Sequence, residues 1–256
     1  MVFGQLSFDE NHENRKRVFQ VYNEYYKANE TEIGNVFGYP AGPAIKEGVA
    51  SVEKAARFKG GSGSVLYNGR EIEMGTMVTD EDFLDMFTIP IVKGNKANPL
   101  ANLTDIVVTE TTAETIFGKE DPIGKTVKIN FGDGLRDLTV SAVAKDIPRA
   151  SSIQFRLLAR IENMPDYAVD KTNWNNQHHY VFVMLKNAAD KIKAEQQMRF
   201  VNQKFLPDWT EGLKKEGAKP DKNGDLFASK LISLDDLHFS PRIAGLSSAV
   251  SKAQIY

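Results

Sequence analysis

Four histidines are the side chains best suited to acid–base chemistry or metal binding: His12, His178, His179 and His238. His178 and His179 are adjacent in a predicted strand, where neighbouring side chains point to opposite faces, so we do not expect them to share a metal ion. His12 precedes a glutamate and His238 follows two aspartates, but neither group has the spacing of a metal or hydrolase motif. The sequence therefore nominates no catalytic, cofactor-binding or metal-ligating residue.

The segment Gly118–Lys125, GKEDPIGK, is close to a phosphate-binding loop. A Walker loop has four residues between its first glycine and its Gly-Lys pair, whereas five residues separate Gly118 from Gly124 here. The following residues, Thr126–Asn130, alternate as a strand does, whereas a phosphate loop leads into a helix whose N-terminal amides hold the anion. We therefore expect no nucleotide binding.

The acidic candidates also have structural interpretations. Asp235 and Asp236 form too common a pair to be identified as the two acids of a glycosidase. The triplet Asp80–Asp82 follows Thr79, and carboxylates are favourable in the first turn of a helix, so we expect a short capped helix to start at Thr79. The two tryptophans are expected to be packing anchors rather than platforms for a ligand.

Composition excludes several classes of site. The chain has 256 residues, enough for one large or two modest domains, and its net charge of −2 does not favour nucleic acid as a partner. Cysteine is absent, which excludes disulfides, thiol catalysis and cysteine-ligated metals. No apolar run reaches the roughly 20 residues that span a bilayer, and the N-terminus lacks a signal-peptide pattern. We interpret both ends, Met1 and Tyr256, as cuts beside removed segments.

The elements that would position any site are short and mixed. The first part predicts a strand, a helix and a strand over Arg17–Tyr26, Pro43–Val52 and Ala55–Lys59. Gly60–Ser64 is expected to be a flexible loop or the end of a hairpin, and Asn68-Gly69 a two-residue hairpin turn.

The stretch Val107–Val127 contains a strand end, a short helix, a glycine stop, a proline turn and a new strand. Thr109 or Thr111 is expected to cap the helix, and Thr111 has capping-box spacing to Glu114. Gly118 is a natural residue at the helix end. Two segments should then pair as a hairpin, Thr126–Asn130 and Leu138–Val143.

The last third predicts longer elements: strands at Ile153–Ile161, His178–Lys186 and Leu226–Leu234, and a helix at Asn187–Phe205. One face of this helix is apolar, with Ala194, Met198, Val201 and Phe205. Ile192 and Phe200 lie off that face, so we expect the helix to contact neighbours on two sides. The element order predicts an α+β fold in which two similar halves flank a β-rich insertion.

Four blocks in this order resemble the extracytoplasmic domain of MacB-like, FtsX-like ABC transporter permeases of the Bacteroidetes type. They are Ser7–Asp9 with His12–Asn14 and Arg17–Val21, then Thr109–Lys125, then Lys145–Pro148 with Ser151 and Phe155, and finally Leu234–Phe239. The second block is the most specific. The chain departs from the family pattern at Phe19, Gln20, Ala150 and Ser152.

The resemblance implies a discontinuous porter-like α+β subdomain over residues 1–68 and 146–256, and an inserted β-rich, Sabre-like subdomain over residues 69–145. It also implies a non-catalytic, cofactor-free ectodomain on the periplasmic side of the bacterial inner membrane. Its partners would be its own transmembrane helices, a cytoplasmic ABC ATPase, a second permease copy or paralogue, and a periplasmic adaptor protein. The isolated chain should be largely monomeric. The alternative is a secreted binding protein or hydrolase unrelated to transport.

Overall fold

The computed structural model describes residues 12–148, 151, 153–237, 240 and 243, and the chain forms two compact units. Unit 1 contains residues 1–12 and 56–170, and unit 2 contains residues 13–55 and 171–256. The boundary falls inside β3 (Val52–Tyr67), because the first four residues of that strand belong to unit 2. The inserted region expected over residues 69–145 lies wholly within unit 1.

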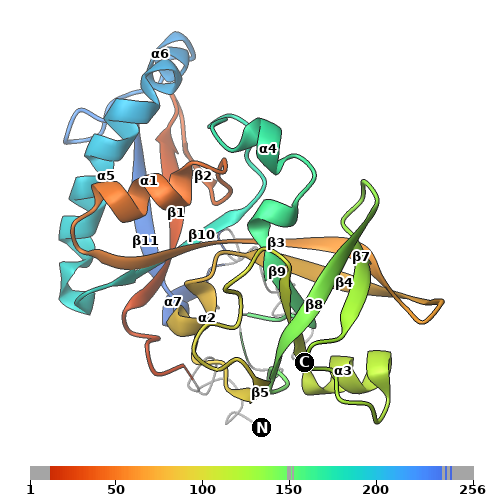
Figure 1. Cartoon of the computed structure of the whole chain (residues 1–256). Helices are drawn as coiled ribbons and strands as arrows, with labels where there is room; N and C mark the ends of the chain where they lie inside the picture. The colour runs from red at the N-terminus through yellow and green to blue at the C-terminus, as the bar shows by residue number, and fades with distance from the viewer. Residues whose placement is uncertain (1–11, 149–150, 152, 238–239, 241–242, 244–256) are drawn as a thin grey trace, which may run out of the picture. The chain divides into compact units, whose positions relative to one another are not determined.

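Unit 2 is a sheet covered on one face by helices (Figure 1). Besides the start of β3, its elements are β1 (Val18–Tyr26), β2 (Thr31–Gly34), α1 (Ala41–Gly48), β10 (Tyr180–Leu185), a 3-10 turn at Ala188–Asp190, α5 (Lys191–Phe205), α6 (Pro207–Lys215), β11 (Phe227–Ser233) and α7 (Leu234–Leu237). Strand β1 is central, with β11 antiparallel on one side and β10 and β2 antiparallel on the other. The strands and helices expected for these segments are confirmed, with small shifts at their ends.

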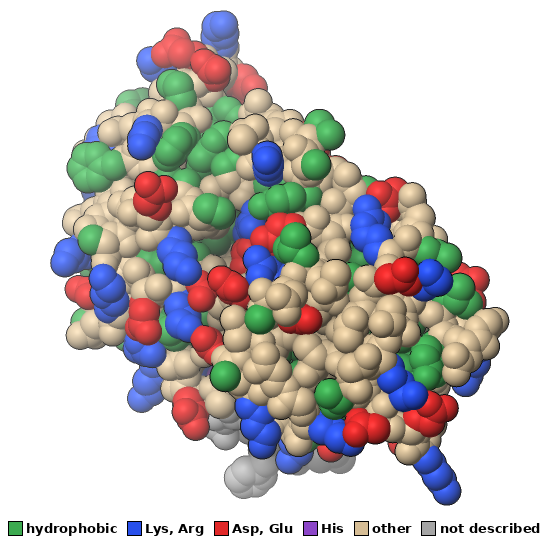
Figure 2. Space-filling model, in the orientation of Figure 1, with side chains coloured by type: hydrophobic (Ala, Val, Ile, Leu, Met, Phe, Trp, Pro, Cys, Tyr) green, Lys and Arg blue, Asp and Glu red, His purple; other side chains and the backbone are tan. Residues whose placement is uncertain are grey.

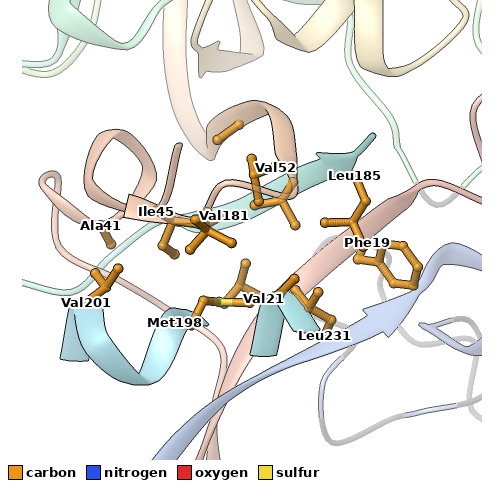
Figure 3. Close-up of a cluster of buried hydrophobic side chains, with 14 of the residues drawn as sticks. Phe19, Val21, Ala41, Ile45, Val52, Val181, Leu185, Met198, Val201 and Leu231 are labelled. Atoms are coloured by element: carbon orange, nitrogen blue, oxygen red, sulfur yellow. The ribbon is translucent and has the colours of Figure 1, made fainter. Parts of the chain in front are cut away.

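The core of unit 2 lies between this sheet and the helices α1 and α5 (Figure 3). Phe19 and Val21 of β1 face Ile45 of α1 and Met198 and Val201 of α5. Alternation along β1 places every second side chain on this face, and the 3.6-residue period of α5 returns its apolar positions to it. The two periodicities therefore explain why these segments pack together.

Unit 1 is built around strands that pair in a closed circuit. Its elements are the rest of β3, β4 (Arg70–Thr79), α2 (Phe83–Met86), β5 (Ile91–Gly94), β6 (Asp105–Thr109), α3 (Glu110–Phe117), β7 (Thr126–Asn130), β8 (Leu135–Ala144), β9 (Leu157–Arg160), a 3-10 turn at Ile161–Asn163 and α4 (Tyr167–Asp170). Strand β3 pairs with β4, β4 with β9, β9 with β6, β6 with β8, β8 with β7, and β7 with β3. Six strands thus close on themselves as in a small barrel, so each of the six has a partner on both sides and none of them is an edge strand.

The Asn68-Gly69 turn and the Thr126–Asn130 hairpin are confirmed. Asn68 and Gly69 have φ values of 50° and 76°, the left-handed pair that a type I′ turn requires, and they join Tyr67 to its partner Arg70. β7 pairs antiparallel with β8 from Thr126 to Asn130.

Three sequence predictions about unit 1 are wrong. Gly60–Ser64 is not a loop but the middle of β3, paired with β4. Thr79 does not begin a helix: it is the last residue of β4, where it pairs with Phe58 and Arg160, and α2 starts after Asp82. The strand expected at Ile153–Ile161 is confined to Leu157–Arg160. In the first two cases pairing with distant strands overrides local propensity, and in the third the strand extends only as far as its pairing with β4 and β6.

Among the described residues, the helices are too short or too polar to cross a bilayer.

Candidate functional site

The sequence predicts that a strand begins at His178, but β10 begins only at Tyr180, so both histidines of the pair lie just before the observed strand. The alternation rule therefore does not apply, and the expectation that the two rings face opposite sides is wrong. Both contact the ring of Tyr39, with centroid distances of 4.8 Å for His178 and 5.1 Å for His179. His12 is buried, and its Nε2 lies 3.3 Å from the hydroxyl of Ser151.

His238 lies outside the described residues. Within the described part of the chain, no group of three or more His, Asp or Glu side chains could hold a metal ion. Asp235 is 3.6 Å from the guanidinium of Arg15, and Asp236 accepts a hydrogen bond from the Ser233 hydroxyl at 2.6 Å. These carboxylates are thus occupied by local contacts.

The Gly118–Lys125 segment has the geometry of a turn, not of a phosphate cradle. Gly118 ends α3 with φ 63°, and the chain continues into strand β7. The ammonium group of Lys125 donates to Glu120 and lies 5.8 Å from the ring centroid of Tyr67. The hydrogen bond raises the pKa of Lys125 and lowers that of Glu120, so this lysine is held by the turn itself.

The start of α3 is joined to the end of β8 by Asp146. Its two carboxylate oxygens accept from the Thr111 backbone N–H at 3.0 Å and from the Thr111 hydroxyl at 2.6 Å. The hydroxyl hydrogen bond lowers the pKa of Asp146. The helix cap itself is Thr109, whose side chain accepts from the N–H of Thr112, so the capping box expected between Thr111 and Glu114 does not form.

The carboxylate of Asp80 holds the buried Arg57. Asp80 Oδ2 accepts from the backbone N–H of Arg57 at 2.7 Å and from its Nε at 2.9 Å, and Oδ1 accepts from Nη2 at 2.6 Å. Burial opposes the charge of Arg57, but the hydrogen bonds and the charge of Asp80 outweigh it and raise its pKa. This fork-shaped pair fixes β3 to the residue that follows β4.

The two tryptophans line a very small cavity in unit 2. Trp174 stacks on Phe205 with a centroid distance of 5.1 Å, and Trp209 lies 6.2 Å from Tyr25. The cavity between them has a volume of about 20 Å³, which is the size of one water molecule. Both tryptophans pack against core clusters of unit 2.

Unit 2 also contains an open groove that the sequence analysis did not identify. It has a volume of about 700 Å³ and lies between α5, the loop before β11 and the outer edge of β11. Ile192 and Phe200 lie on its α5 wall and are 69% and 68% exposed. Helix α5 does contact neighbours on two sides, α1 and β11, but Ile192 and Phe200 do not make these contacts because they are exposed. The position of these two side chains off the apolar face was the available signal for the groove.

The sequence model of one protein family, the MacB-like periplasmic core domain, matches residues 2–201 of this chain. The chain belongs to this family. It is therefore the periplasmic domain of an ABC transporter permease, on the extracytoplasmic side of the inner membrane. A search of the curated proteins found no match.

Solved structures share the fold of this MacB-like domain. A domain of a protein described as a permease from Porphyromonas gingivalis is 22% identical, with a TM-score of 0.71 over 87% of this chain and 91% of that one. The periplasmic region of MacB from Actinobacillus actinomycetemcomitans is 14% identical, with a TM-score of 0.50 over 86% and 91%. The extracellular domain of the ABC-type transporter YknZ from Gram-positive bacteria is 16% identical, with a TM-score of 0.51 over 84% and 100%.

The blocks that identified the MacB-like domain in sequence are joined by side-chain contacts within each unit. In unit 1, His12 of the first block contacts Ser151 of the third, and Thr111 of the second bonds Asp146 of the third. In unit 2, Arg15, which lies between two parts of the first block, is beside Asp235 of the fourth block. The motif residues thus make side-chain contacts that hold separate segments of each unit together.

Proposed function

We propose that this periplasmic domain is non-catalytic and transmits motion. ATP binding by the cytoplasmic ABC ATPase would change the permease, and the domain would pass that change to efflux or to a periplasmic partner. Such a cycle is a two-state equilibrium biased by nucleotide binding far from the domain.

The observation that supports this proposal is that the motif residues make contacts between elements of the fold. Thr111 and Asp146 hold the start of a helix to the end of a strand, and His12 and Ser151 are buried against each other. Side-chain contacts that hold short elements together would keep the domain folded while it moves. The alternative of a secreted hydrolase would need catalytic acids and bases at a cavity, whereas the two acids of the groove in unit 2 are held in ion pairs, Asp225 with Arg199 and Glu195 with Lys230.

We also propose that residues 69–145 are the inserted Sabre-like region, and that residues 1–68 and 146–256 form the porter-like part. The partners that follow from this proposal are the flanking transmembrane helices, the ATPase, a second permease copy and a periplasmic adaptor.

Distance measurements in the complete transporter test the coupling. The chain has no cysteine, so spin labels can be placed at single introduced cysteines. With labels at exposed Lys96 of unit 1 and Lys193 of unit 2, we expect saturating ATP to change the distance distribution. A label pair within unit 1, at Lys96 and Lys119, is the control and should not change. Identical distributions with and without ATP, in a transporter that hydrolyses ATP, would contradict the proposal.

A further inference from the structure

Strand β11 presents a free backbone edge to the groove. The N–H of Tyr26 donates to the carbonyl of Leu226, which sets the phase of the ladder between β1 and β11. Because hydrogen-bonding direction alternates along an antiparallel strand, Phe227, Ser229 and Leu231 point their N–H and C=O groups away from β1. The hydrogen bond of Leu231 confirms this direction, because its N–H donates to Glu195 Oε1 at 3.0 Å and not to β1.

The other two outward N–H groups are open. Over residues 12–148 and 153–237, no hydrogen-bond partner is found for the N–H of Phe227 or of Ser229. Both residues line the groove. An edge strand with open donors and acceptors is a template for an added strand, and a strand that adds there must have an extended backbone.

One wall of the groove selects apolar side chains. Ile192 and Phe200 lie eight residues apart on α5, with exposed Gln196 between them, and all three line the groove. Figure 2 shows hydrophobic side chains gathered over α1, α5 and α6. Every second side chain of an added strand points to the same face of the sheet, so alternate positions of that strand would meet this wall.

The charges at the groove favour an acidic occupant. Its basic residues are Arg199, Lys222 and Lys230, and its acidic residues are Glu195 and Asp225. Both acids are engaged, since Asp225 accepts from Arg199 Nε at 2.8 Å and Glu195 lies 3.7 Å from Lys230 Nζ. Lys222 has no ion-pair partner within the part of the chain that the structure describes, so one positive charge is left for a ligand.

We propose that the groove binds an extended segment of another extracytoplasmic protein as an additional strand beside β11. That segment carries apolar side chains at alternate positions and a carboxylate that reaches Lys222. A second copy of this chain is disfavoured, because two grooves with the same surplus of positive charge would face each other. This inference deepens the proposed function. It depends on that function in one respect, namely that the partner is an extracytoplasmic protein.

The test uses a phage-displayed library of random peptides of about nine residues, a length within the usual range of strands. Selected peptides are synthesised and their affinity for the chain is measured by fluorescence polarisation. We expect alternating apolar and acidic sequences that bind at least about tenfold more weakly to Phe200→Ser and to Lys222→Glu. Val169→Ser, at an 81% exposed apolar residue of unit 1, is the matched control and should bind as the parent chain does.

Hydrogen exchange gives a readout that needs no variant. The amides of Phe227 and Ser229 should gain protection when a selected peptide is bound. The inference is overturned if no peptide is selected, if Phe200→Ser binds normally, if these amides stay unprotected, or if the chain dimerises through β11 instead. None of these results bears on the ATP-driven distance change, which the spin labels report whether or not the groove is occupied.

Discussion

Arg57 and Asp80 form an ion pair whose side chains are only 4% and 19% exposed. Replacing Asp80 by alanine would leave a buried guanidinium and a backbone N–H without their shared acceptor. We expect Asp80→Ala to lower the free energy of unfolding by about 3–5 kcal/mol, the usual cost of removing one partner of a buried pair. Chemical denaturation measures this loss.

The exposed pair of Asp133 and Arg136 supplies the control. Their side chains are 39% and 32% exposed, so water already screens the interaction. Asp133→Ala should therefore change stability far less than Asp80→Ala. Equal effects of the two substitutions would show that burial does not determine the strength of the Arg57 pair.

Asp146 predicts a pH-dependent contribution to stability. The Thr111 hydroxyl lowers the pKa of Asp146 from its ordinary value of 3.8, so the interaction stabilises the fold above that value and is lost as the pH falls through the lowered pKa. We expect Asp146→Asn to cost about 1 kcal/mol or less at pH 7, because the site is exposed. The difference between variant and parent chain should shrink in acid.

The cause of that shift can be checked separately. Thr111→Ala removes the hydroxyl donor but keeps the backbone N–H, so the pKa of Asp146, followed by NMR titration, should rise towards its ordinary value. An unchanged pKa would mean that the hydroxyl is not the main cause.

At the scale of elements, the glycines of β3 differ in what surrounds them. A Cβ at Gly63 would lie 2.6 Å from the carbonyl oxygen of Asn130 in β7, whereas a Cβ at Gly61 would come no closer than 3.9 Å to its neighbours on Thr76. Gly63→Ala should therefore destabilise the chain by forcing β3 and β7 apart. Gly61→Ala should stabilise it by about 0.4–1 kcal/mol, because alanine restricts the unfolded chain.

Thermal denaturation of the two single variants, compared with the parent chain, measures this difference. Opposite signs support the close approach of β3 to β7 as the reason for Gly63. If both variants lose stability equally, the cost comes from the strand itself and not from the neighbour.

The glycine run also shows why local patterns failed here. Gly60–Ser64 has the composition of a flexible loop, yet pairing with β4, and at Ser64 also with β7, holds it as a strand. By contrast, Asn68-Gly69 and α3 were predictable, because their turn, cap and stop residues act within a few positions of each other.

At the scale of the whole molecule, the isolated chain should not bind ATP. Lys125 is held by Glu120, and the chain after it enters a strand rather than a helix. Isothermal calorimetry should show no binding, whereas a clear micromolar affinity would contradict the assignment of ATP chemistry to another domain.

Light scattering of the same chain should report a largely monomeric species. The positive surplus at the groove opposes pairing of two copies through β11, so a stable dimer would also argue against the groove as a site for a foreign strand.

The sequence alone determined the family, the mixed α+β class and most elements, because these depend on short-range patterns: alternation, helical period, caps and turns. Only the tertiary structure decided that six strands of unit 1 close on themselves, that His178 and His179 both meet Tyr39, and that β11 keeps a free edge beside Phe200. Each of these features depends on which distant segments pair and which do not. The local sequence of a strand or helix does not specify which distant segment it will contact, so these pairings are defined only in the folded chain.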